Sequence, residues 1–318
     1  SNYFIIIIYR YAASPHLTSI IILLVVSSYC LVARSDLYHP SFWSRCLNSF
    51  IPLLFFSTKA YSMFKRKETM VEAEETVVDP TAWMLDNLIA EFLCMPGGVM
   101  YMCLFGYTFV HGCKVFKVAA PGSPISSVFV QMVLTCTGGG ILVPIFLNGV
   151  PVPLANDVYP LAIIASFAIH HYFPILRDVA YQSKIVWVIL IIFYETTRAS
   201  VVVKLTLAAS SAIAPSAFSF PVFGPIACGA VGGCGGAFLP LNKGLDPIKK
   251  GLQPPMLTAL IAATCFHLYI NTSLSDGCID ATKKAKVYVA LFFIATGLIS
   301  ALDLSSKSDV VVTKAKEE

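Results

Sequence analysis

From residue 80 onward, long apolar segments alternate with short segments rich in Pro, Gly, Asn and charged residues. Each apolar segment is close to the roughly 20 residues that a helix needs to cross a hydrocarbon core of about 30 Å. The connecting segments are short, so helices that follow each other in sequence are expected to be neighbours. The pattern predicts an all-α membrane protein with seven transmembrane helices, near residues 88–109, 125–147, 154–172, 174–207, 218–240, 254–273 and 285–303.

Residues 1–79 do not follow this pattern. Residues 17–33 form an apolar stretch at the lower length limit for a span, which predicts either a signal-anchor or an additional N-terminal transmembrane helix. A weaker apolar stretch at 48–57 precedes Lys65-Arg66-Lys67 and an acidic run, and this mixture of charges is typical of a solvent-exposed linker. We therefore expect an N-terminal extension at 1–79, a seven-span domain at 80–303 and a cytosolic tail at 304–318.

The composition agrees with a membrane location, since 57% of residues are hydrophobic and only 13% are charged. The net charge of +4 is too small and too scattered to indicate a nucleic-acid partner. The ten cysteines include no CxxC pair and no His at zinc spacing, and most lie inside apolar segments. We interpret them as small buried hydrophobic residues, and we expect no metal site and no required cofactor.

Basic residues near the span ends predict the orientation of the chain. Six lie in the loops after spans one, three and five, and three lie in the loop after span six, which places the first side and the C-terminus in the cytosol. The glycosylation sequon Asn271-Thr272-Ser273 then falls on the lumenal side. Lys314 and Lys316 form a dibasic ending typical of a retrieval address for the endoplasmic reticulum. The basic residues counted in the loops after spans one, three and five are Lys114, Lys117, Arg177, Lys243, Lys249 and Lys250. Those in the loop after span six are Lys283, Lys284 and Lys286.

Spans two and five share a local pattern of two glycines, three apolar residues and a proline, at Gly139-Gly140 with Pro144 and at Gly235-Gly236 with Pro240. Paired glycines weaken a helix and allow another backbone or a solvent-filled gap to come close. Interruptions at matching places in two halves of a membrane protein indicate a site near the midplane. Because each half has three spans, an odd number, the second half must insert upside down. We predict an inverted 3+3 repeat with a peripheral seventh span. The matched glycine pairs predict a functional kink in each span; simple close packing of helices is the alternative, and we assign Gly97-Gly98 and Gly232-Gly233 to it.

Span four carries Arg177, Lys184, Glu195 and Arg198, which lie within about 60° of one another around a helix. Each charge near the centre of an inserting helix costs roughly 2.5–3.5 kcal/mol, so this stripe must face protein or water. Such residues mark ion pathways, proton relays or lipid-headgroup sites. A structural ion pair between Glu195 and Arg198 is the alternative. Lys204 lies on the opposite side of the helix, and we interpret it as an interfacial lysine.

These features together resemble the trimeric intracellular cation channel family over residues 80–303. The resemblance implies homotrimers in the membrane of the endoplasmic or sarcoplasmic reticulum, with the nuclear membrane as a further location. It also implies a potassium-permeable pore through each subunit, counter-ion flow during calcium release, and a phosphoinositide lipid bound near the pore. It rests on the seven spans, the glycine-broken spans two and five, Gly138-Gly139-Gly140-Ile141-Leu142, Tyr172-Phe173-Pro174, and Glu195-Thr196-Thr197-Arg198.

The chain departs from the span-four motif of that family, which reads KEVxRxxK. Glu195 and Arg198 match it, whereas Tyr194 and Val201 stand where the family has lysines. Arg198 is then the one motif cation left to bind a lipid phosphate, and Lys184 is the candidate substitute.

We expect a cation channel whose path is lined by spans two, four and five, with potassium ions and membrane lipid as partners. A secondary transporter and a non-conducting lipid-binding scaffold are the alternatives. An enzyme is not expected, because no nucleophile with its base, metal cluster or paired carboxylates stands at a useful spacing. The predicted pathway residues are Lys184, Glu195, Arg198, Gly139, Gly140, Gly235 and Gly236, and the predicted lipid-binding residues are Arg198 and Lys184.

Overall fold

The computed structural model describes Asp79 and residues 82–240, 244–249 and 251–314. The chain divides into two compact units, Ser1–Asp79 and Pro80–Glu318, and the second contains nearly all described residues. The predicted N-terminal helix at 17–33, the apolar stretch at 48–57 and the charged linker lie outside the described residues, as does Lys316.

In the described residues every regular element is helical. Prolines and an Asn cap define several starts: Asn87 Oδ1 accepts from Ala90 N at 2.8 Å ahead of α4, and Pro96 and Pro124 immediately precede α5 and α6. The first part of the unit comprises η1 (Ala82–Met84), α4 (Leu88–Cys94), α5 (Gly97–Val118), α6 (Ile125–Phe146), α7 (Val152–Ala155), α8 (Val158–Tyr172) and α9 (Pro174–Gln182).

The second part begins at Ser183, whose side chain accepts from Val186 N and starts a helix of 29 residues. It comprises α10 (Lys184–Ala212), α11 (Phe223–Cys234), η2 (Gly235–Phe238), η4 (Asp246–Ile248), α12 (Pro254–Asn271), η5 (Ser273–Ser275) and α13 (Ala281–Lys314).

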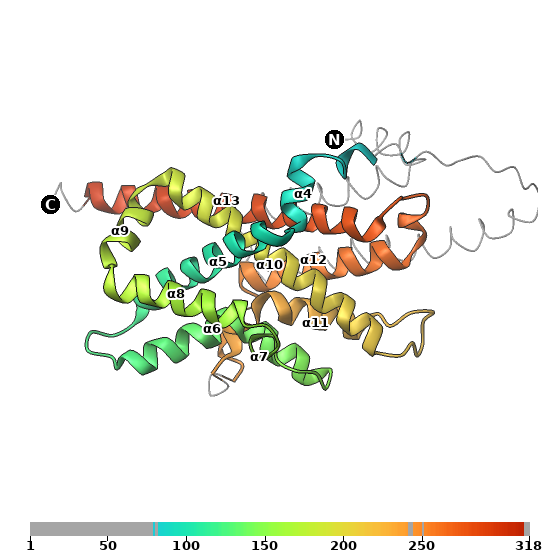
Figure 1. Ribbon diagram of the computed structural model, residues 1–318, viewed down its shortest axis with the longest axis horizontal. Helices are drawn as coiled ribbons and strands as arrows, with labels where there is room; N and C mark the ends of the chain where they lie inside the picture. Colours follow the sequence, from blue (N-terminus) through green and yellow to red (C-terminus); the bar gives the residue numbers. More distant parts are fainter. Residues whose placement is uncertain (1–78, 80–81, 241–243, 250, 315–318) are drawn as a thin grey trace, which may run out of the picture. The chain divides into compact units, whose positions relative to one another are not determined.

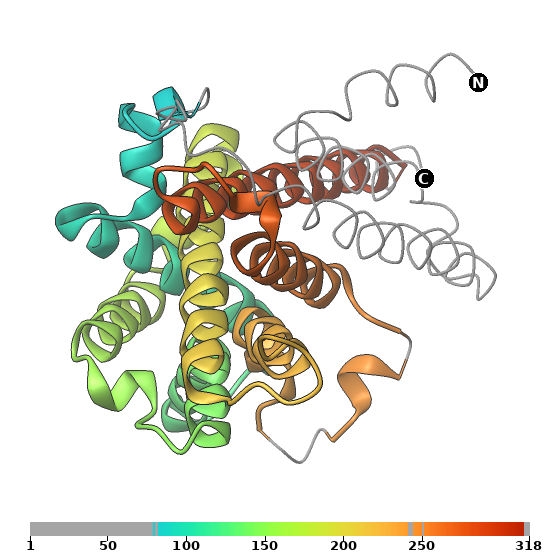
Figure 2. The same ribbon diagram turned by 90° about the vertical axis from the view of Figure 1, so that its right-hand side faces the viewer.

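The helices form two groups of three that contact one another internally, namely α5, α6 and α8, and α10, α11 and α12 (Figure 1). The groups meet where α5 packs on α10 and where α6 packs on α11. The helix α10 lies in the middle of this arrangement, in contact with α5, α11, α12 and α13 (Figure 2). Its central turns from Tyr194 to Ser200 are therefore buried.

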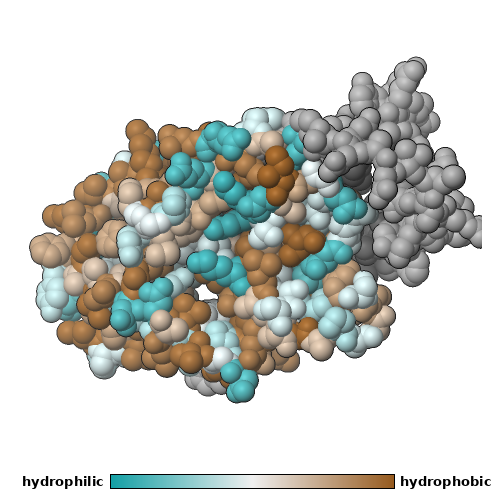
Figure 3. Space-filling model, turned by 45° about the vertical axis from the view of Figure 1, so that its right-hand side comes forward, coloured by the Kyte–Doolittle hydropathy of each residue, from teal (hydrophilic) through white to brown (hydrophobic). Residues whose placement is uncertain are grey.

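Among the described residues, four helices are long and apolar enough to cross a membrane: α5, α6, α10 and the part of α13 from Ala281 to Ala301. The pair α8 and α9 meets the same criteria when taken together, although it bends by 93° at Phe173. The face drawn in Figure 3 is largely hydrophobic, with hydrophilic residues in separate groups. The prediction of an all-α, multi-pass membrane protein is confirmed.

The observed helices differ from the predicted spans at three places. Span one does not run through 88–109, because Met95 adopts a left-handed conformation before Pro96 and separates α4 from α5. Span four does not begin at Pro174, because the chain breaks at Ser183. Span five is shortened, because α11 ends at Cys234 and continues only as a 3-10 turn. Length and hydropathy thus support four or five spans among the described residues, against the seven predicted.

Candidate functional site

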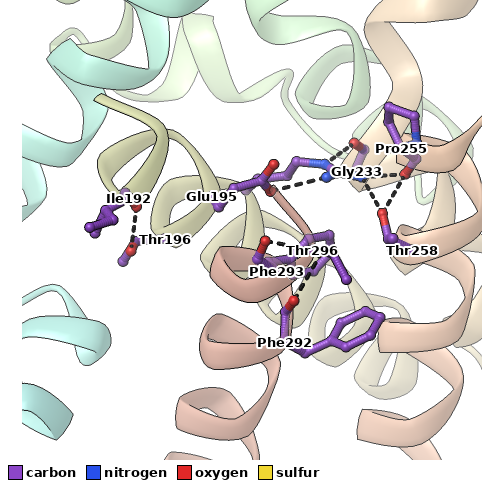
Figure 4. Close-up of polar contacts among 10 residues, drawn as sticks. Ile192, Glu195, Thr196, Gly233, Pro255, Thr258, Phe292, Phe293 and Thr296 are labelled. Atoms are coloured by element: carbon purple, nitrogen blue, oxygen red, sulfur yellow. Dashed lines mark hydrogen bonds and ion pairs between the residues drawn. The ribbon is translucent and has the colours of Figure 1, made fainter. Parts of the chain in front are cut away.

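A buried ion pair stands in the middle of α10. Arg198 Nη1 donates to Glu195 Oε2 at 3.0 Å, and the two side chains are only 6% and 8% exposed. The guanidinium carbon of Arg198 lies 4.5 Å from the centre of the Phe293 ring on α13. Gly297, one turn further along α13, leaves the space that the Glu195 side chain occupies, because any side chain there would overlap it. The predicted pairing of Glu195 with Arg198 is therefore present (Figure 4).

The guanidinium of Arg198 also joins α10 to α11 and α12. Its Nε donates to Gly233 O at 2.9 Å, and its Nη2 donates to Thr258 Oγ1 at 3.0 Å and to Pro255 O. Gly233 lies in the last turn of α11, where backbone carbonyls have no partner within the helix. The arginine thus satisfies a carbonyl that the break after Cys234 would otherwise leave unpaired.

The glycines of spans two and five bring the two backbones into direct contact. Methyl groups added to Gly138, Gly139, Gly235 or Gly236 would each overlap backbone atoms of the opposing segment. α6 nevertheless continues as one helix through its glycines to Phe146, whereas α11 ends at Cys234.

The remaining predicted glycine, Gly140 on α6, faces a different neighbour. A methyl group added to it would lie 3.1 Å from the Val152 side chain of α7. The structure therefore brings Gly139, Gly235 and Gly236 together and leaves Gly140 outside that contact. At these positions the opposing backbone fills the space.

An aromatic cluster lies one turn before Arg198, at the position where the chain departs from the family motif. The Tyr194 ring stacks on Tyr107, with 5.2 Å between ring centres, and His111 lies 5.1 Å from Tyr194. The ammonium of Lys114, from α5, lies 4.5 Å from the centre of the Tyr194 ring. A cation is thus present beside Tyr194, although it comes from another helix.

The remaining predicted charges do not join this group. Arg177 lies on α9, where it pairs with Asp178 at 3.5 Å, so the expected stripe of four charges on one helix is wrong. Lys184 is the exposed first residue of α10, and 14 residues of helix at about 1.5 Å each place it roughly 21 Å from Arg198 along the axis.

Sequence reasoning missed the three acceptors of Arg198 on α11 and α12. Every residue carries a backbone carbonyl, so Gly233 and Pro255 are not distinguished in the sequence as hydrogen-bond partners. The Gly232-Gly233 pair was visible, and both glycines do allow close packing, against Leu205 and against Val202 and Ala259 respectively. Among the described residues, no group of three or more His, Cys, Asp or Glu side chains could hold a metal ion.

Two solved structures are similar to this chain with a TM-score of 0.54 and 19% sequence identity. One is a TRIC counter-ion channel active in calcium release, and the similarity covers 68% of this chain and 98% of that one. The other is a trimeric intracellular cation channel from C. elegans without Ca²⁺, of which 96% is covered. The fold is similar to that of TRIC channels. No protein-family model matches the sequence, and no curated protein matches it either.

The similarity to TRIC channels confirms, at the level of the fold, the resemblance that the sequence indicated. The TRIC-like fold places the Glu195–Arg198 pair at the centre of a helical membrane protein, against the broken end of α11.

Proposed function

We propose that the protein is a potassium-permeable cation channel of the endoplasmic or sarcoplasmic reticulum, a homotrimer with one pore per subunit that carries counter-ions during calcium release. The observation that carries this proposal is the buried Glu195–Arg198 pair in the middle of a long, largely apolar membrane helix, on a fold similar to TRIC channels. Charged residues at membrane depth are costly and mark transport pathways in most known cases.

The proposed architecture is an inverted repeat of α5, α6 and α8 with α10, α11 and α12, and α13 is the peripheral seventh span. Two features support it. The helices of each trio contact one another, and the matching glycines of α6 and of α11 with η2 meet backbone to backbone. A pseudo-two-fold axis between the halves would bring such matching segments together.

In the proposed pathway, ions pass beside α6, α10 and α11, near the end of α11. The C-terminal carbonyls of a helix carry partial negative charge and attract cations. Arg198 occupies one of these carbonyls, that of Gly233, and Glu195 offsets its charge. Conduction then requires the guanidinium to leave Gly233 O, so the arrangement described above is the closed one.

Recording from the purified protein in planar bilayers with potassium as the only permeant cation tests the proposal. We expect single-channel potassium currents in the wild type and an altered open probability in Arg198→Gln. Lys117→Gln, an exposed lysine on α5 outside the site, is the matched control. Absence of potassium current at both voltage polarities would refute the channel.

The break after α11 also suits a secondary transporter with alternating access. Substrate flux that saturates, in the absence of single-channel currents, would favour that alternative. A scaffold would give neither currents nor flux and would still bind lipid.

Phosphoinositide control, the trimer and the location are further parts of the proposal. The hydrogen bonds of Arg198 involve all three of its side-chain nitrogens, so a lipid phosphate must displace one of these bonds or use Lys184 or Lys114 instead. Light scattering of the purified protein tests the trimer. Microscopy of a variant with Lys314 and Lys316 replaced by alanine tests the retrieval address, which should be lost.

A further inference from the structure

A pocket lies on the face of α10 that points away from Arg198. It is lined by the beginnings of α5 and α8 and by Thr197, Ser200 and Lys204 of α10. These three residues lie between about 100° and 160° around the helix from Arg198. The pocket is thus separate from the site that the proposed channel uses.

Two polar groups that line this pocket, those of Ser200 and Lys204, have no hydrogen-bond partner among the described residues. Ser200 is 4% exposed, and its Oγ makes no hydrogen bond, although the neighbouring Thr196 and Thr197 donate to carbonyls four residues earlier, as membrane helices commonly allow. The ammonium of Lys204 makes no hydrogen bond or ion pair with any described residue. A buried hydroxyl without a partner is unfavourable, and an unpaired lysine beside it invites an acceptor with negative charge.

The N-terminal ends of two helices, α5 and α8, lie at this pocket. α5 begins at Gly97, close to the pocket residues Met95 and Met100, and α8 begins at Val158, which lines the pocket. Neither helix has a side-chain cap at its N-cap residue, and Asn156 Oδ1 accepts from Val158 N at 3.0 Å. The N-terminal end of a helix carries partial positive charge. In α8, Val158 N and Tyr159 N already donate to Asn156, so free amide donors are offered by the first turn of α5 and not by α8.

A second ammonium group is near. Lys286 Nζ, on α13, donates to Cys94 O at 2.7 Å, and Cys94 directly precedes the lining residue Met95. Of the described residues that line the pocket, none is Asp or Glu. Lys204 is therefore the one charged residue among those that line the pocket, and its charge is positive.

We propose that this pocket binds a phosphate group. The interior has room for only about one water-sized group, so one phosphate oxygen enters beside Ser200 while the rest of the group stays at the mouth beside the exposed Lys204. A tetrahedral, multiply charged anion matches the ammonium of Lys204, the hydroxyl of Ser200 and the N-terminal end of α5. Free phosphate and the headgroup of a membrane lipid offer the same chemistry, and this proposal does not depend on ion conduction.

The experiment uses the full chain purified in dodecyl maltoside, which contains no phosphate. In one arm, the midpoint of thermal unfolding is followed against inorganic phosphate, with chloride at matched ionic strength. In the other, native mass spectrometry compares retention of phosphatidic acid with that of diacylglycerol. Lys204→Gln should weaken phosphate-dependent binding about tenfold or more, since a charge-assisted hydrogen bond is lost. Ser200→Ala should weaken it less, and Lys204→Arg and the control Lys117→Gln should leave it nearly unchanged.

Stabilisation by inorganic phosphate identifies the free ion as a ligand, and selective retention of phosphatidic acid identifies a lipid. Equal binding by wild type and Lys204→Gln overturns the proposal. Binding in neither arm overturns it as well, because the pocket then holds water only. If Lys204→Gln does not fold, the comparison of Ser200→Ala with wild type decides between the same outcomes.

Discussion

The two polar faces of α10 differ in whether their polar side chains make hydrogen bonds. We call the face with Arg198 the bonded face. On one face, Arg198 donates to a carboxylate, a hydroxyl and two carbonyls from three helices. On the other, the Ser200 hydroxyl is buried without a partner, and Lys204 has none among the described residues. The hydrogen bonds of Arg198 link three helices, whereas the ammonium of Lys204 can still bind a ligand. α10 thus carries, on one face, an ion pair that links three helices and, on the other, the pocket proposed to bind phosphate. Stability measurements can separate the two.

Removing the carboxylate on the bonded face should have the largest effect. Glu195→Ala leaves a buried guanidinium without its counter-charge, which costs about 3–5 kcal/mol in other proteins. The free energy of unfolding is obtained from the midpoint and slope of the unfolding transition in mixed micelles. Lys204→Ala, on the other face, should cost almost nothing, because the lysine makes no hydrogen bond that is lost. Equal losses in the two variants would show that the faces do not differ as described.

The backbone contact between α6 and α11 should give the next largest loss in the free energy of unfolding. Gly139→Ala forces a methyl group against the Gly232 backbone, and such overpacking typically costs about 1–3 kcal/mol. Because α11 also carries Gly233, a displacement of α11 should weaken the hydrogen bond from Arg198 Nε to Gly233 O. Gly98→Ala is the matched control, since nothing lies within 4 Å of a methyl there. A Gly139→Ala protein as stable as the wild type would show that α6 and α11 are not packed backbone to backbone.

Removing the Thr258 hydroxyl on the bonded face should lower the free energy of unfolding less than Glu195→Ala does. Thr258→Val keeps the shape of the side chain and removes the oxygen that accepts from Arg198 Nη2. Hydrogen bonds to charged groups contribute about 1.5–3 kcal/mol, and Pro255 O remains as a second acceptor, so we expect the lower end of that range. Thr264→Val, whose hydroxyl donates only to Leu260 O, is the control. A larger loss in the control than in Thr258→Val would contradict the assignment.

The difference between the faces explains what could be predicted from the sequence. Glu195 and Arg198 are three residues apart, so their pairing follows from helix geometry alone. The glycine pairs are equally visible, and they indicated a kink or a close approach of another backbone. They did not show that the two segments would contact each other. The break at Ser183 was not visible, because the apolar and basic residues around it also fit one continuous helix, and this break moves Arg177 onto α9.

Partners from other helices were also beyond the sequence. A helical wheel correctly put Lys204 opposite Arg198, and it could not show that the beginnings of α5 and α8 meet there. That meeting depends on Met95, which adopts a left-handed conformation and redirects the chain between α4 and α5. Long-range packing of this kind has no local pattern that would reveal it.

The smallest effect on stability should come from Ser200→Ala, and this variant separates the faces most sharply. The change removes a hydroxyl that makes no hydrogen bond, so no bond is lost and the cost of burying an unpaired polar group disappears. We expect a change within about 0.5 kcal/mol of zero, or a slight gain, when the protein is free of phosphate. With phosphate or phosphatidic acid present, the wild type should gain more stability than the variant, because only the wild type can donate to the bound oxygen. A large loss in the absence of any phosphate would mean that Ser200 already has a partner, and the two faces would then be alike.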